Sequence, residues 1–204
     1  MKKFVLSTCV LGLLVMGAFP ADAAKWAGFK GGVNMANLSG DDIDGTESRN
    51  GFSGGAFLGL GIGEQFGVQL EGLYVMKGAN AEVGDTNISL AYIEFPLLFV
   101  AKLPAGDKVN VNLFGGPTLG FNIKAEFEED GVTEDIKDFT KSMEFGAAIG
   151  AGFEYLLDSF SFLVEGRYSL VATSIYEDVG GESPDVMNRG IGIMAGVSFP
   201  IGSN

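Results

Sequence analysis

Few side chains of this sequence are equipped for catalysis or metal binding. The chain has no histidine, and Cys9 is its only cysteine. It therefore lacks Ser-His-Asp and Cys-His nucleophiles, histidine-ligated zinc and any disulfide framework. Paired carboxylates such as Glu71 and Glu165 are able to serve acid–base chemistry, but the sequence supplies no substrate pocket around them. We expect no enzymatic activity, no metal site and no cofactor.

The charged residues within the apolar stretches form the first candidate site. They are Lys30, Glu71, Lys77, Glu94, Lys102, Glu144, Glu154, Glu165 and Arg167. Five of them are predicted to form one interior charge network, near mid-height except for the lower Lys30: Lys30, Glu71, Glu94, Glu165 and Arg167. Enclosed charges must pair, since an unpaired one is costly. The network is then either a selectivity ring or gate for ions, or a static ion-pair plug. We favour the plug, because the interior of a small barrel is just wide enough for side chains.

An acidic cluster between residues 124 and 142 is the second candidate. Three lysines accompany its acidic members, which are Glu126, Glu128, Glu129, Asp130, Glu134, Asp135 and Asp138. The cluster fits a divalent-cation or basic-partner site, or a solvated loop that faces an anionic lipopolysaccharide surface. We favour the solvated loop, because charge runs are common in loops.

Two further patterns carry little weight. The segment 41–45 is rich in aspartate but lacks the spacing and the terminal glutamate of an EF-hand. The segment 190–195 matches a dinucleotide-binding glycine pattern by letter, but no helix is expected after it. The formal net charge of −13 also excludes nucleic-acid partners, because phosphate binding depends on lysine and arginine.

The elements that must position these residues are strands. Apolar and small or polar residues alternate with a period of two, which is typical of half-buried strands. Eight such segments are predicted, at residues 26–38, 52–62, 66–76, 88–102, 109–123, 143–155, 160–170 and 191–199. Pro96 and Pro117 fall inside two of them, where we expect β-bulges because proline cannot donate to the ladder.

The connections between the segments alternate in length. Long polar connections are expected at 39–50, 78–87, 124–142 and 172–187, and short ones at 63–65, 103–108 and 156–159. Outer-membrane barrels show this alternation, with tight turns on the periplasmic side and long loops outside. The prediction is an all-β, eight-stranded, antiparallel up-and-down transmembrane barrel.

Charge placement decides between a membrane barrel and a soluble, lipocalin-like one. A water-facing exterior needs charge on most of its polar positions, and these segments carry too little. We therefore predict that the apolar face meets lipid and that the sparse charges lie inside. Aromatic residues near the segment ends fit interfacial girdles: Trp26, Phe66, Tyr155, Phe160 and Phe199 on one rim, and Tyr74, Phe121 and Tyr168 on the other.

The first 23 residues read as a secretory signal peptide. Lys2 and Lys3 precede an apolar stretch, and Ala21-Asp22-Ala23 supplies an A-x-A cleavage site. The predicted domains are thus a signal peptide at 1–23 and a barrel at 24–204. Export through the periplasm to the outer membrane follows from these two predictions.

Several motifs resemble those of the porin-family, PorT-like outer-membrane β-barrel domain. They are the segments 29–39, 92–98, 115–117, 150–154 and 165–169. The resemblance implies an eight-stranded barrel of the small OmpA/OmpX-like architecture in a Gram-negative outer membrane. The expected partners are outer-membrane lipids and lipopolysaccharide, together with the barrel-assembly machinery during biogenesis. We expect a monomer whose role is structural or carried by its loops. The alternative is a narrow, porin-like channel for small solutes or ions.

Overall fold

The computed structural model describes residues 25–40, 46–81, 86–176 and 186–202. The predicted signal peptide and the segment 41–45 lie outside the described residues. The elements are β1 (Lys25–Ser39), β2 (Thr46–Ile62), β3 (Phe66–Ala81), β4 (Thr86–Pro104), β5 (Val109–Glu129), β6 (Val132–Asp135), the 3₁₀ helix η1 (Lys137–Phe139), β7 (Met143–Leu156), β8 (Ser161–Val171) and β9 (Met187–Ile201). None of the helices in the described ranges is long and apolar enough to cross a membrane.

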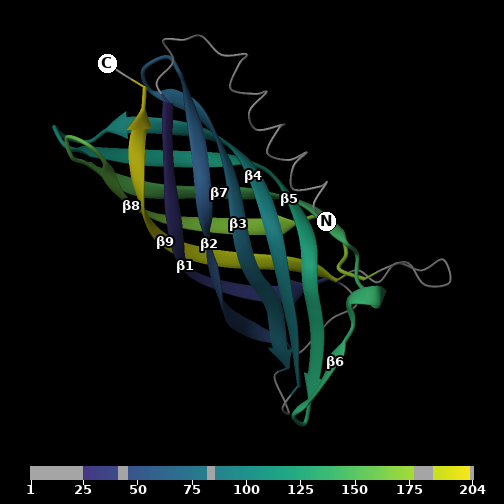
Figure 1. The fold of residues 1–204 in the computed structure, drawn as a ribbon. Coiled ribbons are helices and arrows are strands. Elements are labelled where there is room, and N and C mark those ends of the chain that lie inside the picture. The colour runs from purple at the N-terminus through teal and green to yellow at the C-terminus, as the bar shows by residue number, and fades with distance from the viewer. Residues whose placement is uncertain (1–24, 41–45, 82–85, 177–185, 203–204) are drawn as a thin grey trace.

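Antiparallel pairing of neighbouring strands closes the sheet into a barrel (Figure 1). The strand order is β4-β3-β2-β1-β9-β8-β7-β5-β6, and the pairing of β4 with β5 completes the circle. The short β6 pairs with the far end of β5 and is not a barrel strand. The remaining eight strands form the wall, which confirms the predicted fold class.

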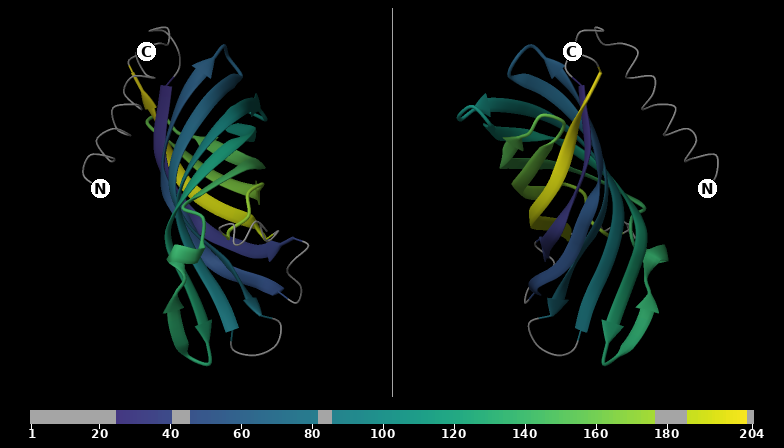
Figure 2. Two further views of the ribbon diagram at one scale, coloured as in Figure 1. Left: turned by 90° about the vertical axis from the view of Figure 1, so that its right-hand side faces the viewer. Right: turned by 60° about the vertical axis from the view of Figure 1, so that its left-hand side comes forward.

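The two ends of the barrel differ. Short turns join β2 to β3, β4 to β5 and β7 to β8 at one end, which we call the turn end, where β1 also begins and β9 finishes. The opposite end, called the loop end, extends furthest along β3, β4 and β5 (Figure 2). The strands reach further into the predicted long connections than the alternation showed. β2 begins at Thr46, and only residues 82–85 separate β3 from β4.

The acidic segment after residue 124 is partly a hairpin and not a loop throughout. β5 continues to Glu129, and Glu126 pairs with Asp135 across the hairpin. Asp130 and Gly131 form the turn, with φ angles of 49° and 79°. A two-residue turn with both φ values positive matches the right-handed twist of a hairpin and is typical of Asp-Gly. This dipeptide is the physical reason for the hairpin.

The bulges predicted at Pro96 and Pro117 are wrong. Both prolines lie inside continuous strands, and the register is the same on either side of each. The irregularity between β4 and β5 lies instead at Ala91 and Tyr92. A proline removes one N–H from the ladder. The residues on both sides of Pro96 and Pro117 nevertheless remain paired with the neighbouring strands, so each strand continues without an inserted residue. The flanking pairs therefore hold the register.

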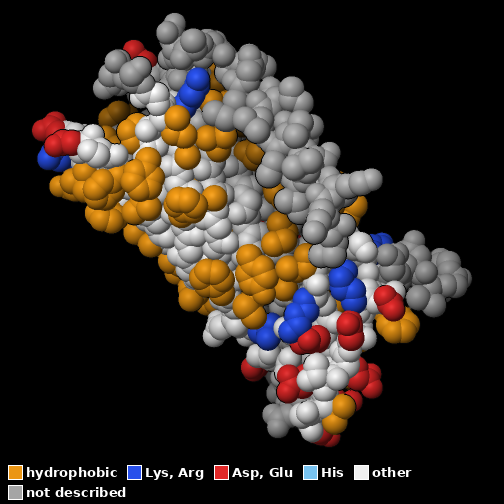
Figure 3. Space-filling view, in the orientation of Figure 1, with side chains coloured by type: hydrophobic (Ala, Val, Ile, Leu, Met, Phe, Trp, Pro, Cys, Tyr) orange, Lys and Arg blue, Asp and Glu red, His pale blue; other side chains and the backbone are white. Residues whose placement is uncertain are grey.

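The exterior of the barrel is apolar around its middle. Large hydrophobic side chains stand on the outward positions, among them Phe29 at 65%, Ile149 at 65% and Phe153 at 64% exposure. Figure 3 shows patches of hydrophobic side chains over the strands on this face, with acidic side chains gathered beyond them at the β5–β6 end. An exterior with this many exposed large hydrophobic side chains marks a surface that meets a partner or a membrane. On a closed barrel, that surface is the one lipid covers.

Candidate functional site: three ion-pair clusters in the lumen

Four of the five predicted network residues meet near the middle of the lumen. Lys30 on β1 places its Nζ 2.6 Å from Oε1 of Glu71 on β3 and 2.9 Å from Oε1 of Glu165 on β8. Arg167, also on β8, places Nη2 2.9 Å from Oε2 of Glu71 and 2.7 Å from Oε1 of Glu165. We call these residues the central quartet. Its two cations and two carboxylates balance, and its members are at most 9% exposed.

The surroundings of the central quartet are aromatic rings and glycines. The rings of Phe57 and Phe114 lie 5.4 Å and 6.0 Å from Lys30 Nζ, and the Arg167 guanidinium lies 5.4 Å from the Phe114 ring. Such cation–π contacts favour charges that have left water. A Cβ at Gly196 would come within 2.7 Å of the Lys30 Cβ. Glycine at this position leaves the space that the lysine needs.

Glu94 is not a member of this cluster, so the prediction of a single five-residue network is wrong. Glu94 forms an ion pair with Lys77 on β3, which also pairs with Glu144 on β7. Glu144 in turn accepts a hydrogen bond from Asn188 Nδ2 on β9, at 3.3 Å. We call Lys77, Glu94 and Glu144 the loop-end triad. Counting residues from the strand end places Glu94 at the height of the central quartet. The strands are tilted, however, and the tilt moves Glu94 toward the loop end.

A third cluster lies near the turn end. Lys102 Nζ lies 3.1 Å from Oε2 of Glu154, and these two residues are called the turn-end pair. Lys102 Nζ also lies 4.2 Å from the Trp26 ring, whose Nε1 donates to Gln69 at 2.9 Å. Trp26 is therefore a lumen residue, 9% exposed, and its predicted place in an interfacial girdle is wrong. The cause is parity, because Trp26 shares the inward face of β1 with Lys30.

The other girdle residues lie on or near the surface. On the turn-end rim, Phe66 is 63%, Tyr155 46% and Phe199 43% exposed, and the Phe160 ring packs edge-on against Phe162 at 5.1 Å. On the loop-end rim, Tyr74 is 36% and Tyr168 42% exposed, and Phe121 is half-buried.

The sequence did not reveal that Glu94 pairs with Lys77, or that Lys102 pairs with Glu154 near the turn end. Lys77, Glu144, Lys102 and Glu154 count among the strand charges, but nothing joined them into pairs. The available signal was parity: Lys77 lies on the same face of β3 as Glu71, and Glu144 lies on the same face of β7 as Glu154.

Two small cavities separate the three clusters. One of about 30 Å³ lies between the turn-end pair and the central quartet, and its lining includes Lys30, Lys102 and Glu165. Another of about 20 Å³ lies between the central quartet and the loop-end triad, and its lining includes Arg167 and Glu94. A cavity holds one water once it offers about 10–15 Å³ of such space, so each has room for about one or two waters.

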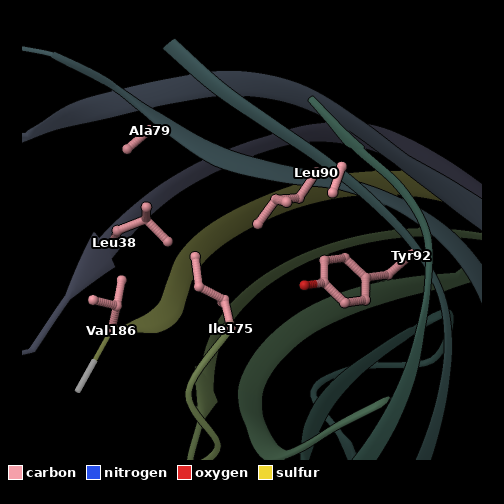
Figure 4. Packing of buried hydrophobic residues seen from close by; sticks show 7 residues of the cluster. Leu38, Ala79, Leu90, Tyr92, Ile175 and Val186 are labelled. Carbon is pink, nitrogen blue, oxygen red and sulfur yellow. The ribbon is translucent and has the colours of Figure 1, made fainter. Parts of the chain in front are cut away.

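A cluster of buried apolar side chains, which we call the apolar cap, lies at the loop end beside the loop-end triad, where the Tyr92 ring lies 5.0 Å from Lys77 Nζ. Its buried side chains come from strand ends and from the connection between β8 and β9: Leu38, Ala79, Leu90, Tyr92, Ala125, Ile175 and Val186. Figure 4 shows Ile175 and Val186 pointing toward Leu38 and Tyr92. Backbone hydrogen bonds hold Ile175 and Val186 in place. Ile175 N donates to Val186 O, and Lys141 N donates to Ile175 O, both at 2.8 Å. Burial raises the pKa of the adjoining Tyr176 phenol.

The acidic cluster is distributed over three elements at the loop end. Glu126, Glu128 and Glu129 lie on β5, Glu134 and Asp135 on β6, and Asp138 on η1, with Asp130 in the hairpin turn. Neighbouring groups engage some of these carboxylates: Lys124 lies 2.8 Å from Glu126, and Asn87 Nδ2 donates to Glu128 at 3.2 Å. Within the described ranges, no group of three or more histidine, cysteine or acidic residues is arranged to hold a metal ion.

A closed antiparallel barrel with an apolar exterior and a charged interior defines the class of outer-membrane β-barrel proteins. The family model "Outer membrane protein beta-barrel domain" matches residues 23–175. The chain belongs to this family, and it is an integral protein of the outer membrane. The resemblance found in its strand motifs is thereby confirmed.

Solved structures share the fold at low sequence identity. Neisserial surface protein A is 15% identical, with a TM-score of 0.55, and the match covers 86% of this chain and 96% of that one. The outer membrane protein AlkL, solved in lipid bilayers, is 13% identical, with a TM-score of 0.50 over 91% of this chain and 96% of that one. At these identities the likeness shows the fold alone. Comparison with curated proteins found no match.

Proposed function

We propose that this protein is a non-enzymatic outer-membrane barrel whose role is structural or carried by its external loops, while its lumen is a static plug of ion pairs. The observation that carries the proposal is the central quartet. It joins β1, β3 and β8 across the lumen through four contacts of 2.6–2.9 Å. Because each carboxylate accepts from both cations, opening a path through the quartet would separate buried opposite charges, which is costly.

Two further features support a sealed lumen. The loop-end triad and the turn-end pair place additional ion pairs on either side of the quartet. The apolar cap lies at the loop end, so an ion that enters from that side encounters apolar side chains before it reaches the charged side chains of the loop-end triad. An apolar constriction opposes ion passage because it excludes water.

The proposal includes the surroundings of the barrel. The apolar belt is the face for outer-membrane lipids, and the acidic hairpin of β5 and β6 faces the lipopolysaccharide surface as a solvated segment. The protein acts as a monomer, and the barrel-assembly machinery inserts it. Its loops carry any contacts with other molecules.

A second candidate function is a narrow channel for ions or small solutes. The observation that favours it is the pair of water-sized cavities, which are lined by charged side chains on both sides of the central quartet. A concerted change of ion-pair partners would be needed to join them.

Single-channel recording in planar bilayers separates the two functions. The plugged barrel predicts no steady conductance from the refolded wild-type protein. Steady conductance that Glu71→Gln or Arg167→Gln abolishes or alters would establish the channel instead. A control variant, Glu128→Gln, changes one carboxylate in the hairpin and leaves the lumen charges intact. It should record like the wild type under either function.

A further inference from the structure

The loop-end triad contains more carboxylates than cations. Lys77 Nζ contacts Oε1 of both Glu94 and Glu144, so a single ammonium group serves two carboxylates. All three side chains are buried, at 5–6% exposure. In the central quartet and the turn-end pair, by contrast, cations and carboxylates are equal in number. If both carboxylates of the triad were ionised, one buried negative charge would lack a counterion, which is costly.

The other cations near the triad are engaged elsewhere or face away from it. Both carboxylates of the central quartet bind the guanidinium of Arg167. Arg189 is exposed and alternates along β9 with buried, inward-facing positions, so its side chain lies on the outward face. Arg49 on β2 donates from Nη1 to the backbone oxygen of Lys77 at 3.3 Å. Among the described residues, the only ion pairs of the triad carboxylates are those with Lys77.

A neutral side chain beside Glu144 suits either of its protonation states. Asn188 is fully buried, and its Nδ2 donates to Oε2 of Glu144 at 3.3 Å. A half-turn of the carboxamide exchanges its nitrogen and its oxygen. Asn188 can therefore donate to an ionised Glu144 or accept from a protonated one. A neutral Glu144 keeps a hydrogen bond at this position.

We propose that the loop-end triad binds one proton at neutral pH, shared by Glu94 and Glu144. The proton takes the place of the missing counterion, because one ammonium then faces one carboxylate and one neutral carboxyl group. It needs no cavity and no coordination shell, so it fits a cluster whose members are in direct contact. The inference does not depend on whether the lumen conducts ions.

Loss of this proton at alkaline pH should affect the apolar cap first. The Tyr92 ring, a member of the cap, lies 5.0 Å from Lys77 Nζ. An excess charge in the triad would then lie directly beside apolar side chains, and water would be drawn toward it. The triad is thus a pH-sensitive element at the loop end.

NMR of the side-chain carboxyl carbons detects the proton directly. The refolded barrel, isotope-labelled at its glutamate carboxyl carbons, is titrated in an uncharged detergent from neutral to alkaline pH. An unperturbed glutamate is ionised above about pH 4.3. Glu94 and Glu144 should together show one bound proton at neutral pH and lose it as the pH rises. Glu154, which has a lysine of its own, should show the ionised chemical shift throughout.

Stability should depend on pH in the direction that a retained proton dictates. The glutamates of the unfolded chain lose their protons above about pH 4.3, whereas the folded triad keeps one. The contribution of the triad to stability therefore falls as the pH rises, until the folded protein loses the proton too. Over that range, each pH unit should raise the contribution of the triad to the unfolding equilibrium constant about tenfold.

A variant of the triad separates this effect from the titration of other groups. Glu144→Gln preserves the shape of the side chain and leaves Lys77 facing Glu94 alone, so neutrality needs no proton. In urea unfolding, the tenfold change per pH unit should be absent from this variant. Glu154→Gln removes one carboxylate from the turn-end pair and is the matched control, which should retain the pH dependence of the wild type.

Three results would overturn the proposal. Ionised chemical shifts for both Glu94 and Glu144 throughout the titration would show that no proton is bound. The same pH dependence of unfolding in Glu144→Gln and in the wild type would place the titrating group outside the triad. A pH dependence that is absent from the wild type and appears in Arg49→Gln would identify Arg49 as the counterion.

Discussion

Removing the cation of Arg167 is the most informative perturbation of the central quartet. Arg167 Nη2 donates to Glu71 at 2.9 Å and to Glu165 at 2.7 Å, and the residue is 7% exposed. Arg167→Gln leaves Lys30 to neutralise two buried carboxylates. Breaking a buried pair by removal of one partner costs about 3–5 kcal/mol, so we expect a loss of this size in the free energy of unfolding.

A second substitution separates charge imbalance from lost packing. Glu165→Gln added to Arg167→Gln restores neutrality and keeps the Lys30–Glu71 pair at 2.6 Å. The double variant should regain about 0.5–3 kcal/mol, which is the usual coupling between residues in one network. Lys108→Gln, at an exposed position in the turn between β4 and β5, serves as the control and should change stability little.

Urea unfolding in detergent or lipid, followed by tryptophan fluorescence, is the suitable assay. Trp26 is the only tryptophan and lies inside the lumen, so its emission reports on the site. If Arg167→Gln unfolds within about 1 kcal/mol of the wild type and the double variant is no more stable, the quartet does not hold the barrel as described.

Two other predictions test the barrel wall. Ile149→Arg places a charge on the lipid face in the middle of β7 and should lower the free energy of unfolding by about 2–4 kcal/mol. Phe139→Arg on η1 should lower it far less, although the two side chains are similarly exposed, at 65% and 67%. Equal losses in urea unfolding would mean that the apolar exterior does not face lipid. Gly28→Ala would bring a Cβ within 2.1 Å of Val197 O and should lower the free energy of unfolding by about 1–3 kcal/mol. At Gly72 the nearest atom to an added Cβ lies at 3.9 Å, so Gly72→Ala should be tolerated. Equal yields of folded barrel for the two glycine variants would contradict this packing.

The strands were predictable because alternation is a local property. Each of the eight predicted segments lies inside, or within one residue of, an observed barrel strand. The strand ends were less predictable, because β2, β3 and β5 continue beyond the lipid-facing stretch, where the apolar positions that reveal a strand give way to polar ones. The Asp130-Gly131 turn was the one local signal for the extra hairpin.

The charge clusters were less predictable than the strands, because they depend on the shear of the barrel. Alternation tells that Glu71 and Glu94 both face inward, but their heights depend on strand tilt and stagger. The pairing of Glu94 with Lys77 and not with Arg167 is therefore a property of the closed structure. The apolar cap was not predictable either. Ile175 and Val186 lie in the connection between β8 and β9, and hydrogen bonds to each other and to Lys141 hold them in the cap.

Accessibility of the lumen to water-soluble reagents tests the central claim most directly. Apart from Cys9, the chain has no cysteine, so single cysteines can be introduced without interference. Ser53 lines the cavity on the loop-end side of the quartet and Ser198 the cavity on the other side, and each is 4% exposed. Ser53→Cys and Ser198→Cys, in liposomes exposed to a membrane-impermeant thiol reagent from either side, should remain unlabelled while Thr133→Cys on β6 reacts at once. Labelling of the two lumen positions at the rate of Thr133→Cys would show that the barrel is open.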